Sequence, residues 1–403
     1  MNKTVNESAL KKSALNDPVA VAADRSPGSS ATRVVFLDGV RGWASLMVVF
    51  SHLLPAFLAI TTPAYRHWYL TFLSDGNFAV YIFFVLSGFA LSIGFLQTGD
   101  VRIPVELALR RYPRLTLPIF ASCTLAYTLM KLHWFFNAAA SVPAHSEDWL
   151  GTFYRFDPDI FHFLKFSLYN VFFNYDIVKS YNQVLWTMSA EFYGSMLIFL
   201  LCLIFPYLRA RWLVLSVLAA VMMIFNSPML PFVLGLGISL SFESGVRKTH
   251  DCSRAALAAS LALILATAAY STISLKGFPT VHDIVVRDTF PMTIFAAVFV
   301  FGISLSARVR GFFGNPLSRY LGSISFPLYL THLLVICSFT SYLFLQGTNV
   351  HLLFLASLVA CLAAATLFRY IERASIRFAR LCSDALMKRI LAPSSRPAAA
   401  AMR

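Results

Sequence analysis

The sequence predicts an all-α integral membrane protein with about ten transmembrane helices and with both termini in the cytoplasm. Three observations support this fold class: 58% of the residues are hydrophobic and only 13% are charged, the apolar residues form long runs, and lysine and arginine are unevenly distributed. Soluble domains are about 45–50% apolar and about 25% charged, whereas a run of about 20 apolar residues spans a bilayer core. We therefore expect a multi-pass protein of the plasma membrane, which in a bacterium is the inner membrane.

Ten apolar runs mark the expected spans, which are residues 37–60, 77–97, 113–133, 183–206, 212–226, 229–243, 255–275, 289–306, 321–346 and 352–370. The runs at 212–226 and 229–243 are short, so they predict either a tight hairpin or a re-entrant segment. Most lysines and arginines fall in the segments that this assignment places in the cytoplasm, as the positive-inside rule requires. Membrane orientation thus explains the net charge of +14, and no nucleic-acid partner is expected.

The chain divides into three parts by composition. Residues 1–35 are polar and turn-rich and lack the apolar core of a signal peptide, so we expect a disordered cytoplasmic tail. Residues 36–372 hold the spans, and residues 373–403 form a basic cytoplasmic tail. The six cysteines fall in spans or in predicted cytoplasmic segments, so neither a disulfide framework nor a metal site is expected.

The first span carries ionisable side chains on one helical face. Asp38, Arg41, Ser45 and His52 fall on one stripe of i+3 and i+4 spacing. An imidazole near the middle of a membrane is costly and usually faces a bundle interior or a wet cavity. His52 is therefore expected to be functional, with a hydrogen-bonded packing role as the alternative. Arg41, about 16 Å away along the helix, could also extend to the lipid headgroups.

The third predicted span is preceded by a group of arginines. Arg110, Arg111 and Arg114 surround Pro113, and proline favours the first turn of a helix. Free N–H groups at a helix start and several guanidiniums together would bind phosphate. Positive-inside anchoring is the alternative explanation.

The fourth and ninth spans each carry polar groups at membrane depth. Glu191 in the fourth span predicts a functional carboxylate with His52 or an arginine as its partner, or else a structural ion pair. Ser325, Tyr329 and His332 form one stripe along the ninth span. This stripe predicts the lining of a cavity.

In this order, the segments resemble the membrane-bound acyltransferase 3 family, whose members move acyl groups, mostly acetyl, onto hydroxyls of sugars and related acceptors. The matching motifs are FLDGVRG…FSH, FFVLSGF, RRYPR, LWTMSAEFYGSM and SISFPLYLTH. The resemblance covers residues 36–372. The stretch SAEFYGS lacks the double glutamate of many sugar O-acetyltransferases, so the acceptor branch stays open.

The resemblance implies a role for each matching residue. His52 would be the essential histidine, with Arg41 as its required partner, and Glu191 would orient or charge the imidazole. The three arginines before the third span would bind acyl-CoA. The cavity would be lined by Asp38, Ser87, Trp186, Tyr193, Ser325, Tyr329 and His332.

The expected function is transfer of an acyl group, most simply acetyl, from cytoplasmic acyl-CoA to a hydroxyl of a carbohydrate, such as a cell-surface polysaccharide or a lipid-linked sugar. Acyl-CoA would be a co-substrate, and no bound cofactor or metal is expected. His52 could act as a general base, or His52 or Ser325 could carry the acyl group covalently. A proton-coupled transporter with a His/Glu relay is the competing hypothesis, but it leaves the arginines without a role. The aromatic-rich loop 134–182 predicts either sugar stacking or an interfacial segment.

Overall fold

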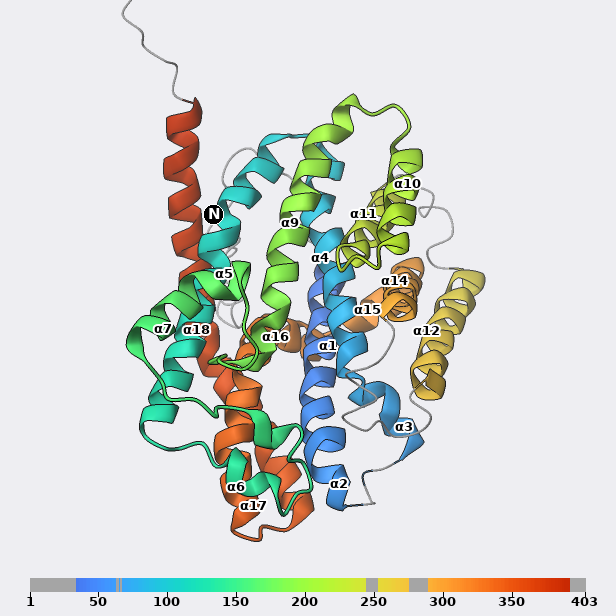
Figure 1. Cartoon of the computed structure of the whole chain (residues 1–403). Coiled ribbons are helices and arrows are strands. Elements are labelled where there is room, and N and C mark those ends of the chain that lie inside the picture. Colours follow the sequence, from blue (N-terminus) through green and yellow to red (C-terminus); the bar gives the residue numbers. More distant parts are fainter. Residues whose placement is uncertain (1–33, 63–64, 66, 244–252, 275–288, 392–403) are drawn as a thin grey trace, which may run out of the picture.

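The structure, a computed structural model, describes residues 34–62, 65, 67–243, 253–274 and 289–391. Within these ranges every regular element is a helix, which confirms the predicted all-α class (Figure 1). The predicted tails lie outside the described residues, apart from positions 34–35 and 373–391.

Six helical segments are long and apolar enough to cross a membrane. They are Val35–Thr61, which comprises α1 (Val35–Leu53), η1 (Leu54–Leu58) and α2 (Ala59–Thr61); α4 (Gly76–Thr98); Gln183–Tyr207, which comprises η6 (Gln183–Trp186), α9 (Thr187–Ile204) and η7 (Phe205–Tyr207); α12 (Arg254–Ser274); Pro316–Leu345, which comprises α16 (Pro316–Val335), η8 (Ile336–Thr340) and α17 (Ser341–Leu345); and α18 (Val350–Leu391). A broken pair, α14 (Thr289–Leu305) and α15 (Ala307–Phe313), bends by 106° and would add a seventh span.

The remaining three of the ten predicted spans are neither among these six segments nor part of the broken pair. The third lies within α5 (Arg102–Lys131), which is 30 residues long but is not apolar enough to count among the six. The fifth and sixth correspond to α10 (Arg211–Ile224) and α11 (Leu230–Glu243), each of 14 residues. A 14-residue helix is about 21 Å long, shorter than the hydrocarbon core of about 30 Å. These two helices contact each other, and each is shorter than a full span.

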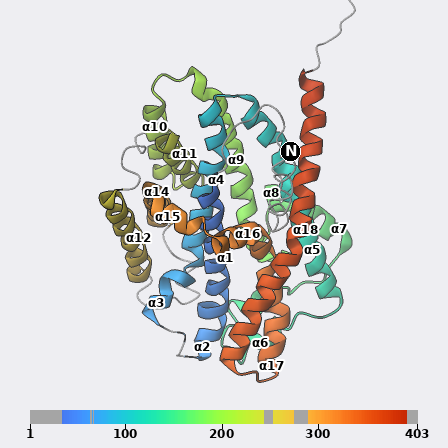
Figure 2. The same ribbon diagram turned by 180° about the vertical axis from the view of Figure 1, so that it is seen from behind.

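The centre of the bundle is formed by α1, α4 and α16 (Figures 1 and 2). Glycines let α1 and α16 approach closely, because a Cβ atom at Gly42 would lie 2.4 Å from the backbone nitrogen of Gly322. The same holds between α4 and α11, where a Cβ at Gly88 would lie 2.1 Å from the carbonyl oxygen of Phe232. Small residues at such crossings are how helices pack inside membranes. This explains the Ser87-Gly88 pair that the sequence places near the middle of α4.

The long helix α18 packs along α5 and α16 on the other side of the bundle (Figure 2). Pro118, inside α5, cannot donate the hydrogen bond that the carbonyl of Arg114 would normally accept. The Ser375 hydroxyl of α18 donates to that carbonyl at 2.7 Å. Since α18 runs unbroken through residue 372, the predicted boundary between the membrane domain and the basic tail falls inside one helix.

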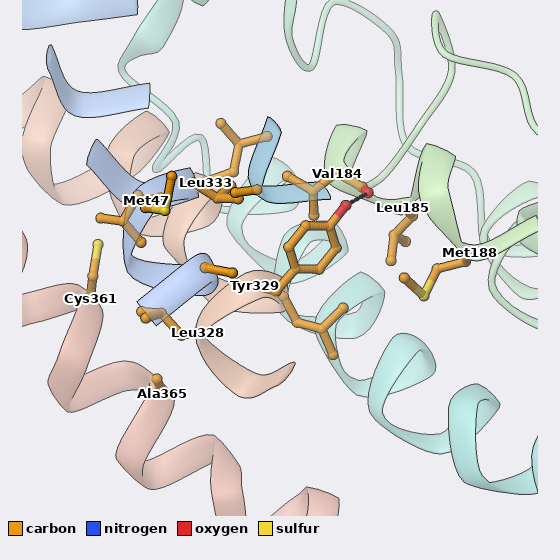
Figure 3. Packing of buried hydrophobic residues seen from close by; sticks show 14 of the residues in the cluster. Met47, Val184, Leu185, Met188, Leu328, Tyr329, Leu333, Cys361 and Ala365 are labelled. Carbon is orange, nitrogen blue, oxygen red and sulfur yellow. Dashed lines mark hydrogen bonds between the residues drawn. The ribbon is translucent and has the colours of Figure 1, made fainter. Parts of the chain in front are cut away.

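The core around α16 holds the polar site in place (Figure 3). Met47 of α1, Leu328 and Leu333 of α16, and Cys361 and Ala365 of α18 are all buried there. Across from them lie side chains of the segment that starts α9 (Figure 3). Helices α1, α16 and α9 are thereby brought around one cavity.

Candidate active site

Two histidines from different helices meet inside the bundle. His52 lies near the end of α1 and His332 lies near the end of α16, and the His52 Nδ1 atom is 2.9 Å from the His332 Nε2 atom. Their rings are stacked with centroids 5.0 Å apart. His332 is fully buried, whereas His52 is partly accessible from a cavity. We call these two residues the histidine pair.

The partners of the histidine pair determine where its hydrogen atoms lie. The His332 Nδ1 atom is 2.9 Å from the carbonyl oxygen of Leu328, which can only accept a hydrogen bond, so we assign the hydrogen to Nδ1. In a neutral His332 the Nε2 atom is then an acceptor, and the Nδ1–H group of His52 donates to it. The Nε2 atom of His52 is left with a free lone pair. A histidine held in this tautomer can accept a proton from a hydroxyl group.

A small cavity of about 70 Å³ adjoins His52. This volume holds a few water molecules. Its lining residues are Val48, Ser51, His52, Ala56, Gly76, Asn77, Val80, Trp149, Val184, Trp186 and Tyr329. The wall is therefore mostly apolar, with a few polar groups at its surface, as is typical of small-molecule sites.

Three of the predicted site residues line this cavity or hold its wall. His52 and Trp186 line it directly, and Tyr329 is buried in its wall. The Tyr329 hydroxyl hydrogen-bonds to the hydroxyl of Thr187 at 2.8 Å and to the carbonyl of Val184 (Figure 3). These bonds attach α16 to the first turns of the α9 segment.

Trp149 and Asn77 also line the cavity, and the sequence had not singled them out. The Trp149 ring lies 5.0 Å from the His52 ring, although the two residues are 97 positions apart. The only sequence signal was the aromatic richness of loop 134–182, which did not indicate a particular residue. Asn77 carried no signal, because a single amide at the start of a span is common.

Glu191 does not lie against His52, contrary to the prediction that it orients the imidazole. Its Oε1 atom forms an ion pair with Arg111 and accepts a hydrogen bond from Ser87 at 2.7 Å. Both charged side chains are largely buried, with 15% of Glu191 and 8% of Arg111 exposed. A buried carboxylate needs a nearby cation, and the arginine of α5 supplies it. The other prediction for Glu191, an arginine partner, is the one that the structure shows.

The arginines of α5 do not surround a helix start, contrary to the prediction that they lie around the N-terminus of a helix. Pro113 lies inside α5, eleven residues after the helix begins at Arg102, so no free N–H groups are present there. Arg110 points to a different partner and forms ion pairs with Glu106 at 2.8 Å and with Asp384 of α18 at 3.3 Å.

Arg41 and Arg114 differ from their neighbours because each lacks a close partner. Among the described residues, neither side chain has a hydrogen bond or an ion pair. Both lie near enough to Arg111 to repel it electrostatically, and the Glu372 carboxylate of α18 attracts both Arg41 and Arg114. We call Arg41, Arg111 and Arg114, with Glu191, the arginine cluster. Two of its guanidiniums are available to an anion.

Three other predicted lining residues lie away from the cavity. Tyr193 is 47% exposed and packs edge-on against Phe173 and Phe192, so it faces outward. The Ser325 hydroxyl donates to the Gly322 carbonyl at 3.0 Å and does not line the cavity. Asp38 lies in the first turn of α1, where its backbone packs closely against Gly322 of α16. Helical spacing grouped Ser325 and Asp38 with the histidines, but neither residue is among those that line the cavity.

No group of three or more His, Cys, Asp or Glu side chains gathers as a metal site within the described ranges. The arrangement instead offers a base beside a small cavity and a separate set of cations contributed by α1 and α5. A base of this kind can accept a proton from a hydroxyl group, and guanidiniums bind anions.

Comparison with known proteins agrees with this chemistry. The model of the acyltransferase domain family, Acyl_transf_3, matches residues 34–370. The chain is 24% identical over 363 residues to the O-acetyltransferase PaAT-1 of Phomopsis amygdali, covering 74% of this chain and 71% of that protein. No solved structure matches the chain. Because the family model matches most of its length, the chain belongs to the acyltransferase 3 family, a family of membrane acyltransferases.

Proposed function

We propose that the protein transfers an acetyl group from cytoplasmic acetyl-CoA to a hydroxyl of a carbohydrate acceptor at the plasma membrane. The observation that carries this proposal is the 2.9 Å contact between the His52 Nδ1 atom and the His332 Nε2 atom beside the cavity, from which we assign the tautomer that leaves the His52 Nε2 lone pair free. Family membership supports acyl transfer, and the name of the relative PaAT-1 supports acetyl as the acyl group and oxygen as the acceptor atom.

The reaction needs one base and one acid, and a single histidine can serve as both. The acceptor hydroxyl gives its proton to the Nε2 atom of His52 while its oxygen attacks the thioester carbonyl carbon. The carbon–sulfur bond then breaks, the ester bond remains, and the imidazolium returns the proton to the departing thiolate. His332 holds the imidazole in position and stabilises the positive charge while the proton is on His52.

Direct transfer is favoured over a relay through Ser325. The Ser325 hydroxyl is bonded to a backbone carbonyl of its own helix and lies outside the cavity lining. It also has no base within hydrogen-bond distance, which a serine nucleophile requires.

The donor would bind through the arginine cluster. Arg41 and Arg114 have no ion-pair partner among the described residues, and guanidiniums bind phosphate oxygens with charge-assisted hydrogen bonds. Arg41 precedes His52 by about 16 Å on the same helix. The long pantetheine arm would follow α1 over this distance and bring the thioester to His52.

The transporter hypothesis receives less support. A proton relay would need His52 and Glu191 to exchange protons, either directly or through intervening groups. Instead, His52 is hydrogen-bonded to His332, and Glu191 is bonded to Arg111 and Ser87.

Labelled acetyl-CoA tests the proposal in membranes from cells that express the full-length protein. We expect label to enter the polysaccharide or lipid fraction with the wild type and to fall at least about 100-fold with His52→Ala. His351→Ala is the matched control, because His351 lies at the start of α18, bonds to Tyr65 and does not line the cavity. Absence of transfer by a folded wild-type protein, or full transfer by His52→Ala, would contradict the proposal.

A further inference from the structure

Residues 133–155 form a compact cap over the two helices that carry the histidine pair. The cap contains α6 (Asn137–Ser141) and the short helix η4 (Leu150–Thr152). It is folded tightly on itself, because the buried Asn137 amide donates to the carbonyls of Leu150 and Phe153 at 2.8 and 3.1 Å. The rings of Phe135 and Tyr154 stack with their centroids 3.9 Å apart.

The cap is bonded to both histidine-bearing helices at equivalent places. Each helix changes to π-helical geometry soon after its histidine. The change occurs at η1 after His52 and at η8 after His332. The Ser146 hydroxyl donates to the Ala56 carbonyl of η1 at 2.7 Å, and the Phe136 amide donates to the Cys337 carbonyl of η8 at 2.9 Å. Single-turn π-helical segments often occur at functional sites. Here they present backbone carbonyls to the cap.

The cap backbone adopts conformations that its residues normally avoid. Four described non-glycine residues have a positive φ, and His133, His145 and Tyr154 of the cap are three of them, with φ of 55°, 52° and 58°. Such conformations persist only where the surrounding structure enforces them, and they concentrate at functional sites. The backbone conformation of the cap therefore costs free energy, which the surrounding contacts must offset.

This shape places Trp149 directly against His52. Trp149 lies between Ser146, which is bonded to η1, and Leu150, which is bonded to Asn137. Its ring is 5.0 Å from the His52 ring and is supported edge-on by Phe153 at 4.9 Å. Trp186, from a different segment, lines the same cavity and is 44% exposed. The cavity beside His52 is thus lined by two indole rings.

We propose that Trp149 and Trp186 form an acceptor subsite at the rim of the cavity, where they bind the apolar face of a pyranose ring. The cavity itself is smaller than a sugar ring, so only one ring hydroxyl would enter it and reach His52. This inference rests on the proposed function, and it assigns binding of the acceptor sugar to the cap together with Trp186. Indole rings offer large, rigid apolar faces with one polar N–H group, which suits a ring whose faces carry C–H groups and whose edge carries hydroxyls. An open-chain polyol has no such face and would bind more weakly.

The test uses purified full-length protein in nanodiscs and two kinds of probe. Methyl glycosides of glucose, galactose, mannose and rhamnose are the pyranose probes, and sorbitol is the open-chain control. The first measurement is protection of His52 from carbethoxylation by diethyl pyrocarbonate, followed by mass spectrometry of the peptide that contains His52. This measurement reports binding and does not require catalysis.

We expect at least one pyranoside to protect His52 at a concentration at which sorbitol does not. Trp149→Leu should raise the half-protecting concentration about 3- to 10-fold, in line with the strength of a single ring contact, and Trp149→Phe should raise it less. Trp134→Leu is the matched control, because Trp134 belongs to the same cap but is 56% exposed and does not line the cavity.

The second measurement is thiol release from acetyl-CoA in the presence of the same probes. The Michaelis constant for the pyranoside should rise in Trp149→Leu by the same factor, while that for acetyl-CoA should stay unchanged, which also shows that the variant is folded. Protection without thiol release would uphold the subsite and contradict the proposed function. Transfer to native membrane acceptors with no protection by any pyranoside, or with protection that Trp149→Leu does not change, would overturn the subsite alone.

Discussion

The histidine pair and the arginine cluster are both polar groups inside an apolar bundle, yet they are accommodated by different means. The histidine pair needs no charge, because the Nδ1–H group of His52 donates to the Nε2 atom of His332. The Nδ1–H group of His332 donates in turn to the carbonyl of Leu328. The arginine cluster contains three cations, of which Arg111 is paired with Glu191, whereas Arg41 and Arg114 are attracted by Glu372 without a direct ion pair, so its charges are only partly compensated. The first arrangement leaves one free lone pair, and the second leaves unpaired cations.

This difference suits two halves of one reaction. A base must be accessible to a neutral hydroxyl, whereas unpaired guanidiniums suit a donor that brings its own negative charge. The comparison therefore predicts that substitutions in the arginine cluster affect folding and donor affinity, whereas substitutions in the histidine pair affect turnover.

The largest expected effect follows the removal of the Glu191 charge. Glu191→Gln leaves Arg111 as a buried cation without its ion-pair partner, which should lower the free energy of unfolding by about 3–5 kcal/mol. The double variant Arg111→Met with Glu191→Leu should recover most of this loss, because no charge then remains unpaired. Thermal unfolding in nanodiscs measures both. A Glu191→Gln protein of normal stability without activity would instead favour a catalytic role for Glu191.

The next effect is on turnover when His332 is changed. His332→Leu removes the acceptor for the Nδ1–H group of His52, so kcat should fall about 100-fold, with the Michaelis constant for acetyl-CoA unchanged. His332→Gln should retain more activity, since its amide oxygen can accept the same hydrogen bond. Steady-state kinetics on both variants tests this prediction, and a normal kcat for His332→Leu would contradict the assigned tautomers.

A smaller effect distinguishes two neighbouring arginines. Arg114→Met should raise the Michaelis constant for acetyl-CoA about 10-fold, because it removes a charge-assisted bond to the donor. Arg110→Met is the control and should leave that constant unchanged, since Arg110 is already engaged by Glu106 and Asp384 in a partly exposed pair worth at most about 1 kcal/mol. Equal effects of the two substitutions would show that the arginines act through general positive charge.

The smallest effect compares two tyrosines. Tyr329→Phe removes buried hydrogen bonds to Thr187 and Val184 and should lower the free energy of unfolding by about 1 kcal/mol. Tyr193→Phe should have no measurable effect, because that side chain faces outward at 47% exposure. Thermal unfolding of both variants checks the prediction, and similar losses would mean that Tyr193 has an inward role.

The sequence predicted more about the fold class than about the number of spans. Apolar runs identify helices reliably, so the helices containing residues 37–60, 77–97 and 183–206 appear where expected. They do not show whether a 14-residue helix crosses the membrane or turns back, because that depends on its neighbours. Pro113 was misplaced for a similar reason. A proline that favours a helix start can also lie inside a helix when the surrounding bundle supplies the packing that tolerates it.

The sequence by itself determined that this is a helical membrane protein of the acyltransferase 3 family and that His52 and His332 lie on inward faces, because composition and helical period are local properties of the chain. Only the tertiary structure decided that His52 meets His332, that Glu191 meets Arg111, and that Trp149 closes over the cavity. Helical periodicity gives the face on which a side chain lies. Which helix it meets, and at what height, depends on how glycines, prolines and the cap set the packing of distant segments.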